Sequence, residues 1–235
     1  MIDFHTHVLP GIDDGAANFE ETKQLLLSQK NQNIEIVVAT PHYNHECPIE
    51  KFVDHRDSSL SYVRKKIDVD IPEIVPAAEV ALYTGLSEEP DLKRLCIGET
   101  DYILIEMPYF YWNSWYYDEL YRLVNNRGVH PIIAHLERYA SMPGQVSRFN
   151  KLLEQDVLVQ INASSLLKFF PRQVVKELWS KNAVSVLGSD CHDPKSRPCT
   201  ISAACRVILR KFGADGLEKM MSNAEAILEN KIVTL

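Results

Sequence analysis

The chain has 235 residues, of which 46% are hydrophobic and 24% are charged, and its formal net charge is −7. This composition excludes a disordered chain, and the acidic balance argues against a nucleic-acid partner. No apolar run approaches the roughly 20 residues that cross a bilayer, the N-terminal sequence lacks the pattern of a signal peptide, and the five cysteines form no C-x-x-C pair. We therefore expect one domain over residues 1–235, located in the cytoplasm, without membrane insertion or a disulfide framework.

Apolar, β-branched runs alternate with helical patterns along the chain. The strands are predicted at residues 1–5, 34–39, 73–78, 102–106, 131–134, 157–161 and 184–188. The helices are predicted at residues 19–31, 86–95, 115–127, 145–155, 171–181, 202–212 and 215–230, and Val53, Leu60, Val63 and Ile67 recur at helical spacing. Asn18 and Glu21 resemble a capping box that opens the first helix. Seven strand–helix units without a glycine-rich nucleotide loop predict an α/β fold whose parallel sheet closes into a barrel.

Histidines and carboxylates follow six of the seven predicted strands, and only the strand at 157–161 ends in amides, Gln160 and Asn162. These candidate ligands are His5, His7, His42, Glu79, Glu106, His135, Asp190 and His192. The carboxyl ends of parallel barrel strands share one face, so we expect these side chains to converge there. Two pairs, His5 with His7 and Asp190 with His192, are separated by two positions, and this spacing points both side chains to the same side of a strand.

The candidate ligands combine imidazoles with carboxylates and include no thiolate. This set favours manganese, iron or zinc over magnesium or calcium, and the share of carboxylates favours manganese. The number of candidate ligands exceeds what one ion needs, so the set predicts a cluster of two or three ions with a bridging carboxylate. Such a cluster of ions would lower the pKa of bound water toward ~7. Arg138 and Arg197 follow two of the ligand motifs, and guanidinium groups bind phosphoryl groups as a fork. Metals and arginines together predict a phosphate ester substrate.

Several motifs in chain order resemble the PHP (polymerase and histidinol phosphatase) superfamily. They are HTHVLPGIDDGA near the N-terminus, ATPH at 39–42, AAEV at 77–80, AHLER at 134–138, QINASSL at 160–166, and GSDCH at 188–192 followed by Arg197. More closely, the chain resembles the bacterial manganese-dependent protein tyrosine phosphatases of capsule and exopolysaccharide loci. The resemblance covers essentially the whole chain. It implies a distorted (β/α)7 barrel with a metal site at the carboxyl ends of the strands.

The resemblance also implies a centre of three divalent ions, manganese first and iron or zinc as alternatives. By position, His5, His7, Glu79 and Asp190 match the ligands of the first ion, Glu79, Glu106 and His135 those of the second, and Asp14, His42 and His192 those of the third. Asp13 is a close rival of Asp14, and the sequence does not separate them. Arg138 and Arg197 match the phosphate-binding arginines. The family often has a second histidine after the TPH motif, where this chain has Tyr43, with His45 further on.

The activity implied by the resemblance is removal of phosphate from phosphotyrosine. The expected partner is the tyrosine-rich C-terminal tail of a bacterial tyrosine autokinase that controls capsular or exopolysaccharide synthesis. In the expected mechanism a metal-bridging hydroxide attacks phosphorus in line, while Arg138 and Arg197 bind the non-bridging oxygens. The sequence indicates no oligomeric state.

Three other functions remain open. One is a histidinol-phosphate or other small phosphomonoester phosphatase of the same superfamily. A second is a cysteine-dependent phosphatase, because Cys191 and Arg197 have the spacing of a C-x5-R loop. That loop contains no glycine, Pro194 lacks an N–H donor, and Asp190 would raise the thiol pKa, all of which argue against this chemistry. The third is a non-catalytic module that binds a kinase tail, which the complete ligand set argues against.

Residues 109–117 contain seven aromatic side chains and follow Glu106. This run has three interpretations: packing of the next helix and loop into the core, a rim that receives a phosphotyrosine ring, or a contact between subunits.

Overall fold

The computed structural model describes residues 1–109, 112–141 and 145–233. The strands in these ranges are β1 (Ile2–Thr6), β2 (Ile36–Ala39), β3 (His42–Tyr43), β4 (Glu73–Pro76), β5 (Glu79–Ala81), β6 (Tyr102–Glu106), β7 (His130–Ile133), β8 (Leu158–Asn162) and β9 (Val186–Gly188). They form one sheet in the order β1-β2-β4 and another in the order β3-β5-β6-β7-β8-β9. Every pairing between neighbouring strands is parallel.

The two sheets join because the short strands β3 and β5 continue the lines of β2 and β4. Two residues separate β2 from β3, and two separate β4 from β5. Backbone hydrogen bonds carry the pairing across this gap: Ala77 N–H donates to the carbonyl oxygen of Ala39 at 2.8 Å, and Glu79 N–H donates to that of Pro41 at 3.0 Å. The nine strands therefore follow seven strand lines.

The remaining edges meet where β1 lies beside the segment after β9. Thr6 and Cys191 form a parallel β-bridge, and His7 N–H donates to the carbonyl oxygen of Cys191 at 2.9 Å. Asp190 N–H donates to the carbonyl oxygen of His5 at 2.7 Å. The predicted distorted (β/α)7 barrel is confirmed, and all seven predicted strands are present.

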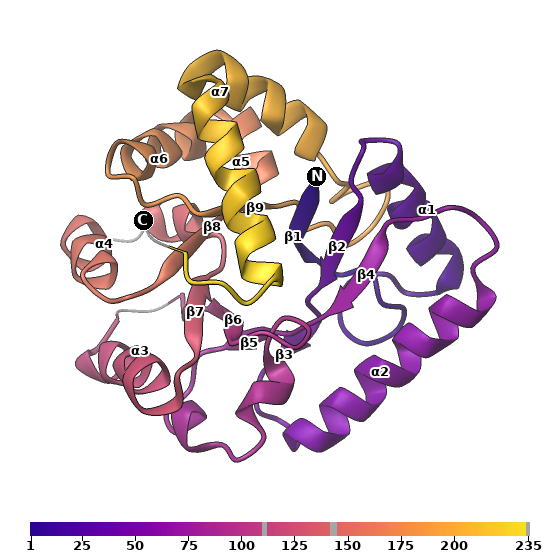
Figure 1. Cartoon of the computed structure of the whole chain (residues 1–235), viewed down its shortest axis with the longest axis horizontal. Helices are drawn as coiled ribbons and strands as arrows, with labels where there is room; N and C mark the ends of the chain where they lie inside the picture. Colours follow the sequence, from indigo (N-terminus) through magenta and orange to yellow (C-terminus); the bar gives the residue numbers. More distant parts are fainter. Residues whose placement is uncertain (110–111, 142–144, 234–235) are drawn as a thin grey trace.

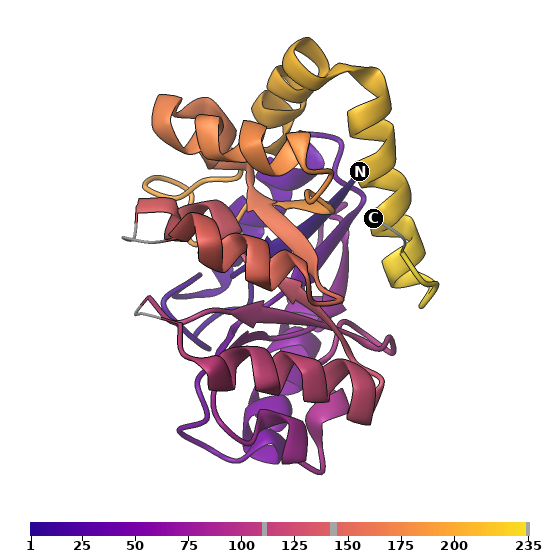
Figure 2. The same cartoon turned by 90° about the vertical axis from the view of Figure 1, so that its left-hand side faces the viewer.

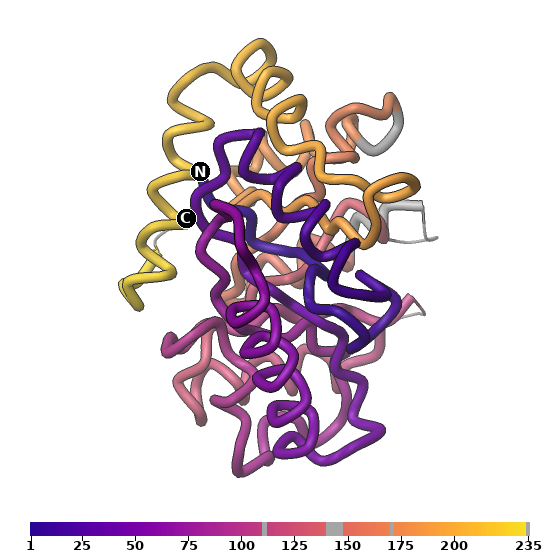
Figure 3. The backbone as a smooth tube through the Cα atoms, turned by 90° about the vertical axis from the view of Figure 1, so that its right-hand side faces the viewer, coloured from indigo at the N-terminus to yellow at the C-terminus, as the bar shows by residue number. Residues whose placement is uncertain are grey.

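Helices surround the strands (Figure 1). They are α1 (Phe19–Lys30), α2 (Ile49–Lys66), α3 (Ser114–Arg127), α4 (Gln145–Leu153), α5 (Ala163–Leu167), α6 (Phe169–Ser180) and α7 (Ile201–Leu228). Figure 3 shows the backbone from the side on which α1 and α2 lie. Figure 2 shows the second half of α7, in yellow, standing along the side of the barrel where both chain termini lie. Among the described residues, no helix is long and apolar enough to cross a membrane.

Local sequence signals explain where several helices begin and end. The Asn18 side chain accepts hydrogen bonds from the backbone N–H groups of Glu20 and Glu21, at 3.0 and 3.1 Å, and opens α1 as predicted. Helix α3 ends at Gly128, whose φ of 60° is the left-handed conformation that favours glycine. Gly213, with a φ of 84°, interrupts α7 between the two predicted helices.

One predicted helix was wrong, and one helix was missed. The segment 86–95 forms two short 3-10 helices, η1 (Leu86–Glu88) and η2 (Leu92–Leu95), and not one α-helix. Pro90 lies between them, and proline removes a backbone donor and disfavours helical backbone at the residue before it. The short helix α5 was not predicted, because its five residues are too few to show a helical period.

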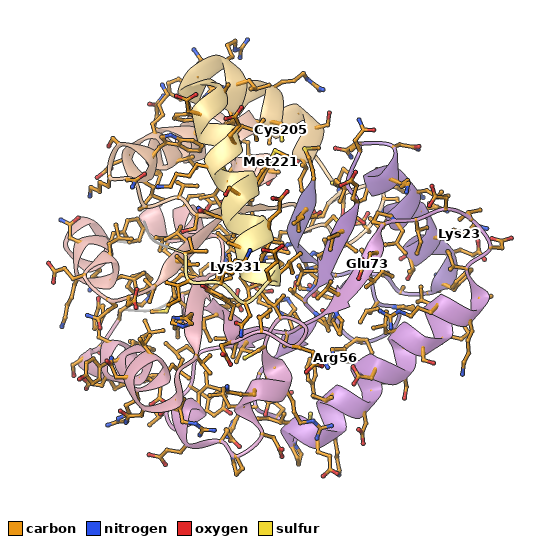
Figure 4. The ribbon with its side chains drawn as sticks, in the orientation of Figure 1. Lys23, Arg56, Glu73, Cys205, Met221 and Lys231 are labelled. Atoms are coloured by element: carbon orange, nitrogen blue, oxygen red, sulfur yellow. The ribbon has the colours of Figure 1, made fainter. Side chains whose placement is uncertain are left out.

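The strands are buried between the barrel interior and the helices. All five residues of β8 and the first four of β6 are buried. Burial on both faces explains why the sequence of β6 is an apolar run up to Glu106. A charged side chain is also part of this packing. Arg56 of α2, labelled in Figure 4, is 5% exposed and donates to the carbonyl oxygens of Ala77 and Arg94 at 3.3 and 3.1 Å.

Candidate metal centre

All nine predicted metal ligands lie together at the carboxyl ends of the strands. Their ligand atoms form four overlapping groups, and within each group the atoms lie within 4.8 Å of one another. The groups are His7, Asp14, His42 and His192; His5, His7 and Asp190; His5, Glu79 and His135; and His42, Glu79 and Glu106. This grouping differs in detail from the one that the resemblance implies, because Glu106 and His135 fall in different groups, although their atoms are 3.7 Å apart.

Glu79 lies at the middle of the cluster and is 1% exposed. Its Oε2 atom is 3.0 Å from His5 Nε2, 3.3 Å from His7 Nε2 and 3.1 Å from His42 Nδ1. Its Oε1 atom is 2.8 Å from His135 Nε2. One carboxylate thus faces four imidazoles, which is the arrangement that a bridging ligand between several cations requires.

The backbone is strained where two of these ligands leave their strands. His135 and Asp190 follow β7 and β9 and have φ angles of 32° and 53°. Left-handed backbone at residues other than glycine costs of order 1–3 kcal/mol and is concentrated at functional sites. Here the conformation occurs at the turns that carry both side chains into the cluster.

Asp13 and Asp14 occupy different positions, which the sequence did not distinguish. Asp13 accepts hydrogen bonds from His7 Nδ1 at 2.7 Å and from the backbone N–H groups of Gly15 and His42, both at 2.9 Å. It therefore orients His7 so that the other ring nitrogen faces Glu79. The Oδ1 atom of Asp14, in contrast, is 3.4 Å from the Nε2 atoms of both His42 and His192. The geometry favours Asp14 as the ligand and Asp13 as the residue that positions a ligand.

Gly15 allows this loop to fold back on the first strand. A Cβ atom at this position would lie 2.3 Å from the carbonyl oxygen of His7 and 2.5 Å from its Cβ. The carbonyl oxygen of His7 accepts a hydrogen bond from Ala16 N–H at 3.0 Å. Only a residue without a side chain permits this close approach, which holds both aspartates at the centre.

A buried nitrogen without a hydrogen-bond partner tests whether these residues fit a cation. His192 Nδ1 donates to the carbonyl oxygen of Asp190 at 3.1 Å, so Nε2 carries the lone pair. That Nε2 atom is buried and makes no hydrogen bond. It faces the Asp14 carboxylate, and a divalent ion between the two would satisfy both. The donor set therefore fits a metal ion.

Burial and crowding shift the titration of the cluster. Burial alone would lower the pKa of His7, but hydrogen bonds to Asp13 and Glu79 and the charges of these carboxylates raise it to about 10. Burial would raise the pKa of Glu79, but the charge of His5 and hydrogen bonds with the histidines hold it well below its usual range. Burial and the charge of Glu79 raise the pKa of Glu106 to about 7. In the absence of metal, a proton on His7 thus balances part of the negative charge of the neighbouring carboxylates.

Metal loading is therefore expected to release protons and to weaken as the pH falls. Because the pKa of His7 is about 10, its ring is protonated at neutral pH, and a metal ion binds only a deprotonated ring nitrogen. Each proton displaced should lower the metal affinity about tenfold per unit of pH decrease. Calorimetric titration with manganese, in two buffers of different ionisation enthalpy, counts the released protons. A count of zero at neutral pH would contradict this expectation.

The two predicted phosphate-binding arginines lie side by side on Asp190. Arg138 donates a hydrogen bond to Asp190 Oδ2, and Arg197 donates to Oδ1 at 2.9 Å. Burial would raise the pKa of Asp190, but the charges of His5 and Arg138 hold it well below its usual range. Both arginine side chains are about one-third exposed, at 33% and 38%, whereas Asp190 is buried. The guanidinium groups therefore form a positive, solvent-accessible edge beside the buried ligands of the cluster.

Two amides of β8 connect the ligands of three other strands, and the sequence analysis assigned them no role. Gln160 Oε1 accepts from His5 Nδ1 at 3.1 Å and from the backbone N–H of His135 at 2.8 Å. Gln160 Nε2 donates to Asn162 Oδ1 at 2.9 Å, and Asn162 Nδ2 donates to Asp190 Oδ2 at 2.7 Å. The available signal was their spacing of two at the one strand end without a charged ligand.

Replacing Gln160 by leucine is expected to weaken metal binding about tenfold to a hundredfold, because the substitution frees the ring of His5 and leaves Asn162 without its donor. The affinity for manganese, measured by calorimetry, checks this expectation. The matched control is Gln173→Leu on the exposed face of α6. Equal affinities for both variants would show that the amides do not orient the ligands.

Cys191 points away from the centre into the core. It is fully buried, and its Sγ atom accepts from Gln29 Nε2 at 3.6 Å. Burial, together with the charges of Asp3 and Cys199, raises the pKa of the Cys191 thiol well above its usual range. A reactive cysteine requires an exposed, easily ionised thiol, so the geometry opposes the cysteine-dependent alternative.

The Cys191→Ser variant is accordingly expected to keep its metals and to retain phosphatase activity within about threefold of the parent chain, because only a buried space-filling group changes. Cys191→Ala serves as a second variant, since it adds no buried hydroxyl. Loss of all activity in both variants, with metal content and melting temperature unchanged, would instead support a thiolate nucleophile.

Most described aromatic residues of the 109–117 run belong to the core. Trp112 is 6% exposed, donates to the carbonyl oxygen of Pro108 at 3.0 Å and packs on Tyr139 and Phe149. Tyr116 and Tyr117 are also buried, at 6% exposure each. Tyr109, by contrast, is half exposed, and residues 110 and 111 lie outside the described residues.

The TPH motif continues away from the cluster. Tyr43 is buried and donates to the carbonyl oxygen of Cys47 at 3.1 Å, and the His45 ring packs on Tyr83 at 4.3 Å. Neither side chain belongs to the four groups. An apolar cavity of about 110 Å³ is lined by Met1, Cys205 and Met221, among others, near the N-terminal ends of β1 and β2. Figure 4 shows Cys205 and Met221 near each other beside α7.

The chain is similar over nearly its whole length to a known family and to individual proteins. A family model described as "Capsular polysaccharide synthesis, CpsB/CapC" matches residues 1–229. The tyrosine-protein phosphatase YwqE of Bacillus subtilis is 30% identical over 239 residues, covering 99% of this chain and 93% of the relative. The tyrosine-protein phosphatase CpsB of Streptococcus agalactiae serotype III is 27% identical over 248 residues, covering 99% and 100%.

Solved structures agree with these sequence similarities. A structure from work on YwqE of Bacillus subtilis and CpsB of Streptococcus pneumoniae, described as unique metal-dependent tyrosine phosphatases, matches with a TM-score of 0.87 and 28% identity. The match covers 100% of this chain and 96% of the other. A histidinol phosphate phosphatase of Lactococcus lactis matches with a TM-score of 0.55 over 90% of this chain and 93% of the other. At 13% identity, that second match shows a shared fold alone.

Proposed function

The chain belongs to the CpsB/CapC family of capsular polysaccharide synthesis, and on this premise we propose that it is a metal-dependent phosphatase of phosphotyrosine. The family membership confirms the resemblance to the tyrosine phosphatases of capsule loci. The observation that carries the proposal is the buried cluster around Glu79 with two arginines at its accessible edge. This combination offers cation binding and phosphate binding in one place.

The proposed metal ligands are His5, His7, Asp14, His42, Glu79, Glu106, His135, Asp190 and His192. Four overlapping groups of ligand atoms support more than one ion, and we propose three. Manganese is favoured over iron and zinc because carboxylates and imidazoles share the site without a thiolate. When bound, such ions supply a water activated at neutral pH and stabilise negative charge on phosphoryl oxygens.

The residues of the chain orient the substrate beside the cluster. Arg138 and Arg197 hold the non-bridging phosphoryl oxygens, because a guanidinium presents two parallel N–H donors to two oxygens. Asp190 holds both guanidinium groups in place in the structure, at the edge of the buried cluster. The departing phenolate has a conjugate acid of pKa ~10, so the reaction needs less proton donation than an alkoxide would.

The proposed substrate is the phosphotyrosine-bearing C-terminal tail of a bacterial tyrosine kinase in capsular or exopolysaccharide synthesis. Support comes from the family description and from the names of the relatives. The location in the cytoplasm stays a prediction.

The test is hydrolysis of a phosphotyrosine peptide, a phosphoserine peptide and histidinol phosphate, first after chelation and then with manganese added back. We expect manganese to restore activity that strongly prefers the phosphotyrosine peptide. Activity on histidinol phosphate alone would replace the substrate class with the small phosphomonoesters of the histidinol phosphatase neighbour. Activity that survives chelation, in protein shown to be free of metal, would overturn the metal-dependent mechanism.

A further inference from the structure

Tyr109 lies beside the metal centre and has no role in the function proposed above. It follows Glu106, the last residue of β6, by three positions, and 51% of its side chain is exposed. Trp112, Tyr116 and Tyr117, in the same aromatic run, are each 6% exposed. An exposed aromatic side chain beside a candidate substrate site is a surface on which a ligand can pack.

A buried aromatic residue supports the ring of Tyr109. The ring centroids of Tyr109 and Tyr139 are 5.1 Å apart, with 45° between the ring planes. Tyr139 is fully buried and packs in turn on Trp112, at 5.5 Å, and on the candidate ligand His135, at 5.9 Å. Tyr109 thus packs on a buried aromatic side chain that also contacts a candidate metal ligand, while half of the surface of Tyr109 faces solvent.

The side chain of Tyr109 lies close to the phosphate site. The guanidinium of Arg138 is near enough for its charge to act on the Tyr109 phenol, and it donates a hydrogen bond to Asp190. Burial raises the pKa of Tyr109, although the charge of Arg138 opposes this shift, so the phenol is protonated at neutral pH. The side chain of Tyr109 therefore lies next to a proposed phosphate-binding arginine.

We propose that Tyr109 is the stacking surface for the phenyl ring of the substrate and that it selects aryl over alkyl phosphate esters. This inference rests on the proposed function. A phosphotyrosine whose phosphoryl oxygens bind Arg138 would bring its ring to the exposed half of Tyr109, which lies near that guanidinium. Aromatic rings pack at centroid distances of 4.5–7 Å in offset or edge-to-face arrangements.

An alkyl ester gains nothing from this surface. In phosphoserine a single methylene joins the phosphate to the peptide backbone, so no ring lies opposite Tyr109. The selectivity arises from the partner ring and not from the phosphate, because both kinds of ester present the same phosphoryl oxygens to Arg138 and Arg197.

The experiment compares Tyr109→Ala and Tyr109→Phe with the parent chain, all loaded with manganese. Binding of phenylphosphonate and methylphosphonate is measured by calorimetry, and turnover is measured with phenyl phosphate and a phosphotyrosine peptide. We expect Tyr109→Ala to weaken phenylphosphonate binding and to lower kcat/KM for both aryl substrates about tenfold. Methylphosphonate binding should not change. Tyr109→Phe keeps the ring and should retain the preference for the phenyl group.

The matched control is Tyr121→Ala, which removes a tyrosine that is 57% exposed on α3. It should leave all four measurements unchanged. Equal weakening of both phosphonates by Tyr109→Ala would show that Tyr109 acts through Arg138 or the fold, and no weakening would show no contact; either result overturns the inference. The phosphonate measurements need no turnover. A chain that binds phenylphosphonate through Tyr109 but does not hydrolyse phosphotyrosine would contradict the proposed function alone.

Discussion

Replacing Glu79 by glutamine is expected to lower kcat/KM for a phosphotyrosine peptide at least about a thousandfold, and to reduce the bound metal. The two oxygens of the Glu79 carboxylate face four imidazoles, at 2.8 to 3.3 Å. Glutamine keeps the shape but removes the negative charge and replaces one acceptor oxygen with an NH2 donor. A neutral amide cannot bridge cations, so the electrostatic basis of the reaction is lost.

Metal content by mass spectrometry, together with steady-state kinetics, checks this expectation. The control is Glu73→Gln, the same substitution at the exposed first residue of β4, which is labelled in Figure 4 and should leave activity within about twofold. A Glu79→Gln variant that retains both its full metal content and its activity would remove Glu79 from the centre.

Replacing Arg138 or Arg197 by alanine is expected to lower kcat/KM about a hundredfold each. Both side chains lie on Asp190 at the accessible edge of the cluster, and removing one preorganised donor to phosphoryl oxygens commonly costs 10²–10³ in rate. The double variant should lose less than the product of the single losses, because both donors serve one phosphate. Lysine should restore only part of the activity, since it keeps the charge without the fork.

Inhibition by inorganic phosphate separates phosphate binding from an effect on the metals. We expect the inhibition constant to rise in each alanine variant while the metal content stays at the parent level. Arg206→Ala, at an exposed position of α7, is the control and should change neither quantity. Alanine variants that lose their metals would mean that the arginines hold Asp190 and not the substrate. Unchanged inhibition would exclude them from the phosphate site.

The strand pattern was accessible from sequence because parallel strands are buried on both faces. The five residues of β6, YILIE, are an apolar run that ends in a candidate ligand, and the structure has the strand at the predicted place, Tyr102–Glu106. Helices were less certain where local backbone effects compete with the apolar period. Pro90 divides the segment 86–95 into two 3-10 helices, where one α-helix was predicted.

The candidate ligands could also be named from sequence, since strand ends of one barrel meet on one face whatever the loops do. The side chains that these ligands contact could not be named from sequence. Asp13 and Asp14 are neighbours in the chain, and only the close approach of Gly15 to His7 determines which carboxylate receives the His7 ring and which faces His192. Spacing along the chain says nothing about atoms that meet across a turn at 3 Å.

The sequence by itself determined the order of the strands, the chemical identity of the groups at their ends and the family to which the chain belongs. These properties follow from local periodicity and from motif spacing, which do not depend on how distant segments pack. Only the tertiary structure decided that Gln160 and Asn162 connect the ligands, that the Cys191 thiol lies in the core and that Tyr109 reaches Arg138. Each of these is a contact between segments at least 25 residues apart, or a matter of burial. Such contacts depend on the closure of the whole barrel, because no single segment holds both partners.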